Sequence, residues 1–256
     1  MERVTSRQNS AVQHVKKLAS NRKYRRESGE FLCEGPKMWA EAMVRGWTVS
    51  ALLTSEEGIA RECEGVPART VLVSPEVLSY AADTETPQKL AFTCPIPEEP
   101  ERLPGGRLLV LDGVQDPGNV GTIWRTADAF GADGLVLLPG CADPWSPKVV
   151  RATMGACFRL PVWNCTLDRL TALLEEENIP LYATALREDT LDIRAADLSR
   201  CAVVIGSEGR GVSGQVLAQC AQTLKIPMRE RCESLNAAMA AGVVLWEAWR
   251  QLEIRS

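Results

Sequence analysis

The sequence of 256 residues has no apolar run long enough to cross a membrane. The longest candidate, residues 237–246, contains Gly242 and ends at Glu247, well short of the ~20 apolar residues that a spanning helix needs. The first ten residues, MERVTSRQNS, are polar, so we expect no secretory signal peptide. These absences predict a protein without a membrane partner.

The sequence also lacks the cysteine and histidine patterns of disulfide scaffolds and metal sites. Its nine cysteines are odd in number and contain no C-x-x-C pair, so we expect reduced thiols, no bound metal and a cytoplasmic location. His14 is the single histidine, and we expect it to contact RNA or solvent rather than to act in acid–base chemistry. With no histidine to pair with them, Cys157 and Cys201 are predicted to be small core residues.

Two nucleotide-binding patterns are missing as well. There is no GxxxxGK[ST] sequence, and no GxGxxG directly follows an expected strand. An ATPase and a nicotinamide-dependent oxidoreductase on a Rossmann sheet are therefore disfavoured.

Basic charge is concentrated at the start of the chain, although the net charge of the whole is −4. Residues 1–26 hold eight basic side chains and one acidic one, a charge of +7, which leaves −11 for the rest. Because acidic partners at helical spacing are missing within this segment, it predicts contact with RNA or DNA more than a solvated helix face. The predicted RNA-binding residues are Arg3, Arg7, Lys16, Lys17, Arg22, Lys23, Arg25 and Arg26.

Residues 95–106 read as a linker, because they hold four prolines, two glycines and three glutamates. Residues 1–94 before them alternate helix signals (10–19, 37–45 and from Pro75) with strand signals (30–33, 49–54, 70–73 and 90–93). This pattern predicts a small N-terminal α/β domain, and the basic segment at its start predicts that the domain binds RNA.

Residues 107–256 alternate apolar strands with helices, which is typical of a mostly parallel sheet buried on both faces. The expected strands are 107–112, 134–138, 162–163, 181–184, 202–205 and 223–226. Helices are expected from Asn119, Ser146, Leu167 and Ser234. The sequence therefore predicts an α/β fold for this part.

Three polar segments follow strands in this second part: NVGTIWR from Asn119, GSEGRG from Gly206 and IPMRERCESLN from Ile226. Ligands bind at strand ends of open α/β sheets, so the three predict one composite site. The alternative is purely structural: Asn119 and Ser234 are good helix N-caps, and Arg125 could be a surface residue.

Together the segments resemble the three motifs of the SpoU/TrmH-type RNA 2′-O-methyltransferases of the SPOUT superfamily. The first carries N-x-G-x-x-x-R as Asn119, Gly121 and Arg125, and the second carries G-x-E-G from Gly206. The third carries I-P-M…S-L-N, from Ile226 to Asn236. The N-terminal part resembles the substrate-binding domain often fused to this family.

The resemblance implies S-adenosyl-L-methionine as cofactor, a homodimer through the SPOUT domain, and a deep trefoil knot. Implied catalytic residues are Arg125, Asn119, Glu208, Ser234 and Asn236. Implied cofactor contacts are Gly206, Ile226, Leu235, Met228, Thr184 and Ala185. Arg125 is expected to orient the ribose or phosphate and to stabilise the developing oxyanion, since a guanidinium is a poor base. Glu230 departs from the family, which usually has glycine two residues after the methionine of I-P-M.

The function expected from the resemblance is 2′-O-methylation of ribosomal RNA, of the 23S type. A tRNA methyltransferase and an antibiotic-resistance rRNA methyltransferase are alternatives with the same layout. A non-enzymatic alternative is an RNA-binding or ribosome-assembly protein that keeps the fold.

Overall fold

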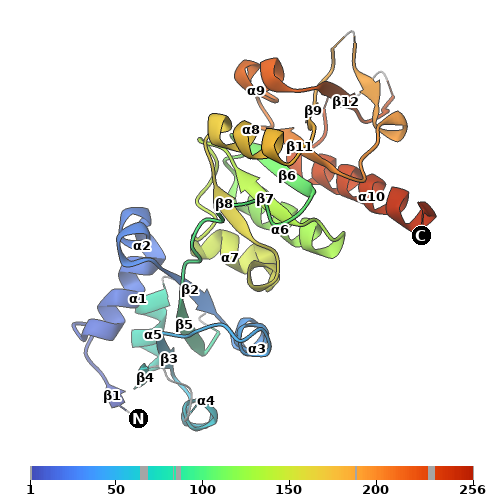
Figure 1. Cartoon of the computed structure of the whole chain (residues 1–256). Coiled ribbons are helices and arrows are strands. Elements are labelled where there is room, and N and C mark those ends of the chain that lie inside the picture. Colours follow the sequence, from blue (N-terminus) through green and yellow to red (C-terminus); the bar gives the residue numbers. More distant parts are fainter. Residues whose placement is uncertain are drawn as a thin grey trace. The chain divides into compact units, whose positions relative to one another are not determined.

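The computed structural model describes residues 2–63, 69–82, 84, 88–187, 189–229 and 234–255 (Figure 1). The chain forms two compact units. The first comprises Met1–Glu98 and Asp143–Phe158, and the second comprises Glu99–Ala142 and Arg159–Ser256. The division into domains at residues 95–106 stays a prediction, and Glu230 lies outside the described residues.

The first unit is built on a mixed sheet of five strands, counted over its described residues. Their order is β1 (Glu2–Val4), β4 (Arg69–Val73), β3 (Ala51–Thr54), β5 (Leu90–Pro95) and β2 (Glu30–Glu34). β1, β4 and β3 are parallel, whereas β5 is antiparallel to both of its neighbours. The helices of this unit are α1 (Ser10–Ser20), α2 (Arg22–Ser28), α3 (Pro36–Val44), α4 (Glu57–Glu62), α5 (Pro75–Ala82) and α7 (Pro147–Thr153).

One core of this unit lies between the sheet and the helices α1 and α5. Val12, Val15 and Leu18 recur along α1 at the spacing of one helix face, and they pack with Leu78 and Leu53. The helix α5 begins as expected, with Pro75 in its first turn and the Ser74 hydroxyl accepting the Val77 amide at 3.3 Å. The predicted strands are confirmed, but β1, α2 and α4 were not predicted.

His14 has specific protein partners instead of the RNA or solvent contact that the sequence suggested. Its Nε2 lies 2.7 Å from the Glu30 carboxylate, and its Nδ1 lies 2.9 Å from the Tyr24 hydroxyl. The hydrogen bond with His14 lowers the pKa of Glu30. His14 therefore ties α1 to α2 and β2.

Residues 143–158 pack with the first unit although they belong in sequence to the second. Phe31 of β2 lies against Trp145 with ring centroids 4.5 Å apart, and Trp47 meets Phe158 at 5.1 Å. Arg151 of α7 forms an ion pair of 2.7 Å with Glu34, whose pKa is raised by burial. Aromatic packing and charge thus hold this segment on β2.

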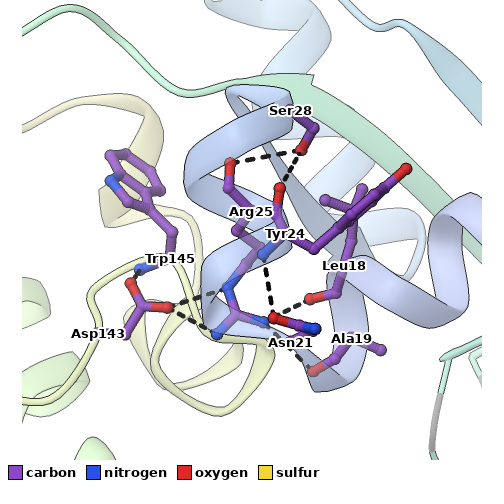
Figure 2. Close-up of polar contacts among 8 residues, drawn as sticks. All are labelled: Leu18, Ala19, Asn21, Tyr24, Arg25, Ser28, Asp143 and Trp145. Atoms are coloured by element: carbon purple, nitrogen blue, oxygen red, sulfur yellow. Dashed lines mark hydrogen bonds and ion pairs between the residues drawn. The ribbon is translucent and has the colours of Figure 1, made fainter.

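A buried guanidinium connects α2 to the same segment (Figure 2). Arg25 donates to the Asp143 carboxylate from Nε at 2.9 Å and from Nη2 at 2.6 Å. Its Nη1 donates to the Leu18 carbonyl at 2.5 Å, at the end of α1. The Arg25 and Asp143 side chains are 6% and 13% exposed. Arg25 was predicted to bind RNA, but its guanidinium is enclosed and held by Asp143 and the Leu18 carbonyl, so we leave it out of the RNA-binding group.

Removing the carboxylate should destabilise the fold because it leaves a buried guanidinium without its counter-charge. We expect Asp143→Ala to lower the free energy of unfolding by about 3 kcal/mol, measured by urea denaturation. The matched control is Glu27→Ala, which removes an exposed carboxylate 3.6 Å from Lys23 and should cost less than about 1 kcal/mol. Equal losses in the two variants would contradict a structural role for the Arg25–Asp143 pair.

The second unit contains a parallel sheet of seven strands in its described part. Their order is β10 (Leu191–Asp192), β12 (Gln222–Lys225), β9 (Leu181–Thr184), β11 (Cys201–Gly206), β6 (Arg107–Asp112), β7 (Gly134–Leu137) and β8 (Val162–Asn164). Its helices are α6 (Pro117–Ala129), α8 (Leu167–Glu176), α9 (Gly214–Gln219) and α10 (Ala237–Arg255). The predicted α/β class with a mostly parallel sheet is confirmed.

Helices cover both faces of this sheet. On one face Leu170 of α8 and Val216 of α9 pack with Val110 and Val204, which project to the same side of β6 and β11. The long C-terminal helix α10 runs beside α6 (Figure 1). Its Val244 lines a small cavity together with Leu109 and Val203, which alternate with Val110 and Val204 along the strands and so face the other side of the sheet. No helix in the described part of the chain is long and apolar enough to cross a bilayer.

Two helices begin at residues other than those expected. α6 starts at Pro117, two residues before Asn119, because the Asp116 carboxylate accepts the Asn119 amide at 2.8 Å and proline fits the first turn. α10 starts at Ala237 instead of Ser234, because the Asn236 side chain accepts the Ala238 amide at 2.9 Å. Aspartate and asparagine cap these helices, which leaves the Asn119 and Ser234 side chains available for other contacts.

Candidate active site

The three polar segments meet at one edge of the parallel sheet. β6 and β11 are neighbours in register, with Asp112 opposite Gly206. β11 also pairs with β9, which in turn pairs with β12. Because all of these strands run in one direction, the segments that follow them lie at the same edge.

Gly206 is required by a close approach of two stretches of backbone. A Cβ atom at this position would lie 2.1 Å from the Gly211 carbonyl carbon and 2.2 Å from the Val212 nitrogen. Just beyond it, Ser207 and Gly211 exchange two backbone hydrogen bonds of 3.1 and 2.9 Å. Gly211 has a φ of +67°, which favours glycine. Residues 207–211 therefore form a loop closed against the end of β11, which we call the motif loop.

A chain of hydrogen bonds joins the three segments. The side-chain Nδ2 of Asn119 donates to the Glu208 carboxylate, and the side-chain Nδ2 of Asn236 donates to the Asn119 Oδ1 at 3.2 Å. Three of the predicted catalytic residues thus come together from α6, the motif loop and the start of α10. Ser234 lies in the segment that lines the cavity described next. Arg125 has an exposed side chain on α6 and is not among the described residues that line this cavity.

A cavity of about 270 Å³, the first cavity, opens beside the motif loop. All six predicted cofactor contacts line it: Thr184, Ala185, Gly206, Ile226, Met228 and Leu235. Its walls are mainly apolar, and Glu208 and Ser234 bring polar groups to it. The Thr184 hydroxyl is turned into the sheet, where it donates to the Val204 carbonyl at 2.9 Å.

The sequence did not indicate several other lining residues. Ile205 and Leu224 are the last apolar residues of strands, and Leu186 follows Ala185, so their place at strand ends was the available signal. Ala240 comes from the second turn of α10, and only the folded structure reveals its position.

A second cavity of about 440 Å³ lies at the same sheet edge. It is lined by the motif loop and by the turns that follow β6 and β7: Asp112, Gly113, Gln115, Pro139, Gly140, Ser207, Glu208, Gly209, Arg210, Gly211 and Ser213. Ser207, Glu208 and Gly211 line both cavities. None of the residues from the β6 and β7 turns was predicted as a site residue.

Three cysteines of the second unit have thiols whose pKa is raised by burial. Burial raises the pKa of Cys141, next to Gly140, to about 11. Burial likewise raises the pKa of Cys201 to about 12 and that of Cys220 to about 11. All three are neutral at neutral pH, so they are poor nucleophiles, as predicted for Cys201. In the described ranges no three His, Cys, Asp or Glu side chains are grouped to hold a metal ion.

The basic residues at the start of the chain lie on the first unit, and most of them are exposed. Arg7 and Lys16 lie over the Tyr80 ring at 5.0 and 5.2 Å, and Lys17 lies over the Tyr24 ring at 5.3 Å. Of the remaining predicted RNA-binding residues, Arg3, Arg22, Lys23 and Arg26 are exposed. These residues, without Arg25, form what we call the basic surface.

Comparison with known families identifies the chain. Residues 106–246 match the model of the SpoU rRNA Methylase family, and residues 9–91 match an MRM3-like substrate binding domain. The first match spans more than half of the chain. The chain belongs to the SpoU rRNA Methylase family. The three motif segments all fall within the region matched to this family.

Relatives of similar length support this assignment. The chain is 33% identical to the 23S rRNA (guanosine(2553)-2'-O)-methyltransferase RlmP of Bacillus subtilis, over 96% of this chain and 98% of that protein. It resembles the AdoMet-bound rRNA methyltransferase from Sinorhizobium meliloti with a TM-score of 0.88 and 32% identity, covering 98% of both chains. It also resembles the SpoU methyltransferase AviRb from Streptomyces viridochromogenes in complex with AdoMet, with a TM-score of 0.88 and 31% identity over 96% of this chain and 99% of that one.

Proposed function

We propose that the protein is an S-adenosyl-L-methionine-dependent 2′-O-ribose methyltransferase acting on ribosomal RNA of the 23S type. The observation that carries this proposal is the first cavity, where all six predicted cofactor contacts come together beside the hydrogen-bonded Asn119, Glu208 and Asn236. Relatives named as 23S rRNA 2'-O-methyltransferases, aligned over nearly the whole chain, support the substrate.

The first cavity fits an adenosyl ligand by its chemistry. Its volume of about 270 Å³ is just below the ~300–1,000 Å³ typical of small-molecule sites, and its apolar walls suit an adenine ring and a thioether. Ile226, Leu235 and Met228 would pack on the ligand. Gly206 lets the backbone of the motif loop close beside it. When bound, S-adenosyl-L-methionine supplies a methyl group activated by the positive charge on its sulfur.

The chain's own task is to position a ribose hydroxyl and to manage its proton. The Glu208 carboxylate accepts hydrogen bonds, so it can hold the 2′-hydroxyl as well as the Asn119 amide. Asn236 fixes the Asn119 side chain and thereby the direction in which Glu208 points. Ser234 supplies a further hydroxyl at the rim of the cavity. We assign Arg125 to orienting the ribose or phosphate and stabilising charge on the attacking oxygen.

Two features implied by the family complete the proposal. A homodimer is supported by α10, where Met239, Trp246 and Trp249 are 63%, 47% and 39% exposed and recur on one side of the helix. The trefoil knot and the cytoplasmic location stay predictions. The non-enzymatic alternative of an RNA-binding or assembly protein is less well supported, because the first cavity and the hydrogen-bonded trio are both present.

The cofactor site can be tested by placing a charge in the first cavity. Leu235→Arg should lower the affinity for S-adenosyl-L-methionine at least about tenfold in calorimetric titration, because a guanidinium replaces an apolar wall. The control is Leu191→Arg on β10, since Leu191 is 38% exposed, much like Leu235 at 37%, but is not among the residues lining the cavity. Equal affinities of the two variants would argue against this cofactor site.

Arg125 can be tested by separating binding from chemistry. Arg125→Ala should slow methyl transfer to 23S rRNA at least about 100-fold while leaving the affinity for S-adenosyl-L-methionine within about twofold. Arg169→Ala, which removes an exposed arginine from α8, is the control and should retain activity. A wild-type rate in Arg125→Ala would remove this residue from the mechanism, and loss of cofactor binding would assign it a different role.

The basic surface can be tested by its dependence on salt. Changing Lys16, Lys17, Arg22 and Lys23 to alanine should weaken RNA binding and reduce the slope of log K against log salt by about 3, because each phosphate contact contributes to that slope. The control changes Lys37, Arg45, Arg61 and Lys89, which removes the same charge elsewhere in the first unit. Identical slopes in the two variants would show that only overall charge matters.

A further inference from the structure

Gly209 stands at the tip of the motif loop without a local reason to be glycine. A Cβ atom built there meets no atom within 4 Å, and its φ lies outside the left-handed region. The two other glycines of this segment do have such a reason. A Cβ atom at Gly206 would lie 2.1 Å from the Gly211 carbonyl carbon, and Gly211 has a φ of +67°. Neither packing nor backbone conformation demands glycine at 209. A glycine at this position leaves the surface of the motif loop bare, that is, without a side chain.

The bare surface faces the second cavity, since Gly209 lines that cavity and is absent from the described residues lining the first. The opposite walls are two tight turns that contain Gly113 and Gly140, with φ of +68° and +95°. A Cβ atom on Gly140 would lie 3.6 Å from the Gly113 Cα, so these turns lie against each other. Four glycines, at 113, 140, 209 and 211, thus leave backbone without side chains in the wall of the second cavity, and a flat ligand can approach closely there.

The polar groups of the second cavity suit a nucleotide. The exposed Gln115 amide offers donors and an acceptor, which matches the mixed edge of a base. Arg210 offers a planar guanidinium that can stack on a base or pair with a phosphate. Asp112 is partly used, because its carboxylate accepts the Ser213 amide at 2.6 Å. The volume of about 440 Å³ falls within the range of ~300–1,000 Å³ seen for small-molecule sites.

Glu208 fixes how such a nucleotide would lie. It lines both cavities and is held by the Asn119 amide, so it marks the boundary between them. A base inserted beyond Gly209 would leave its ribose at this boundary. The 2′-hydroxyl would then be next to the carboxylate and close to the first cavity.

We propose that the second cavity binds the target nucleotide of the RNA, with its base over Gly209 between Gln115 and Arg210 and its ribose at Glu208. This inference rests on the proposed methyltransferase function and assigns the residues that hold its substrate. An unstacked base that leaves its RNA helix or loop is the form that enters such a cavity.

The test is to fill the space above Gly209. Gly209→Leu adds a side chain at a residue that lines the second cavity and is not among the described residues lining the first. The affinity for S-adenosyl-L-methionine should therefore stay within about twofold, while kcat/KM for 23S rRNA transcribed in vitro falls at least about 100-fold. Gly214→Leu is the matched control. Gly214 also has an open Cβ position and an ordinary φ, lies in the same unit, and is not among the residues lining the cavity, so its kcat/KM should be unchanged.

A direct binding measurement separates this inference from the proposed function. Guanosine and uridine 5′-monophosphates at millimolar concentration are titrated by saturation-transfer NMR into the wild type and both glycine variants. We expect binding to the wild type and to Gly214→Leu, and its loss in Gly209→Leu. That pattern supports the cavity even if the wild type transfers no methyl group, an outcome that would overturn only the proposed function. Wild-type kcat/KM in Gly209→Leu, or nucleotide binding that is absent from the wild type or equal in all three proteins, would overturn the cavity assignment.

Discussion

The site depends on one close approach of backbone to backbone, that of Gly206 to Gly211 and Val212. The Ser207–Gly211 hydrogen bonds close the motif loop, and this closure is possible only because residue 206 has no Cβ. The closed loop presents Glu208 to both cavities and within reach of the Asn119 amide. Any side chain at 206 would have to open the loop, and opening it would displace Glu208 from both cavities at once. The arrangement of the active site therefore rests on a steric constraint more than on any single hydrogen bond.

The first unit depends on a different kind of constraint, a charge removed from water. The Arg25 guanidinium can be buried because its N–H groups donate to the Asp143 carboxylate and to the Leu18 carbonyl. These bonds fix the orientation of the Arg25 side chain relative to Asp143 as well as the distance between them. This contact gives residues 143–158 their place beside α2 and β2, together with the aromatic contacts of Trp145 and Phe158. Consequently the chain passes between the two units after Glu98, after Ala142 and again after Phe158.

Sequence reasoning succeeded where the determining forces are local. Apolar runs predicted six of the seven strands in the described part of the parallel sheet, and missed only the two-residue β10. The three motif segments were correctly expected to meet, because parallel strands share one edge. It failed where the role of a residue depends on a partner that is far away in the sequence. Arg25 and Asp143 are 118 positions apart, so nothing in the basic segment distinguishes Arg25 from its exposed neighbour Arg26. The second cavity was missed for the same reason, since its turns after β6 and β7 carry no motif and acquire meaning only when they face the motif loop.

The distribution of charge assigns affinity for RNA to the basic surface and selection of the target nucleotide to the cavities at the sheet edge. The basic surface carries exposed cations, and the tyrosine rings beneath Arg7 and Lys17 hold those side chains near the surface while leaving their charge accessible. Contacts from such cations to phosphates supply binding without sequence information. Around the cavities at the sheet edge the carboxylates Glu208 and Asp112 balance the cations Arg210 and Lys225. The two cavities therefore offer no net attraction for a polyanion and are poorly suited to supplying affinity. Their walls of backbone and directional polar groups can instead discriminate between nucleotides. A residue at the sheet edge should therefore affect which nucleotide reacts, whereas a residue of the basic surface should affect how often RNA is bound at all.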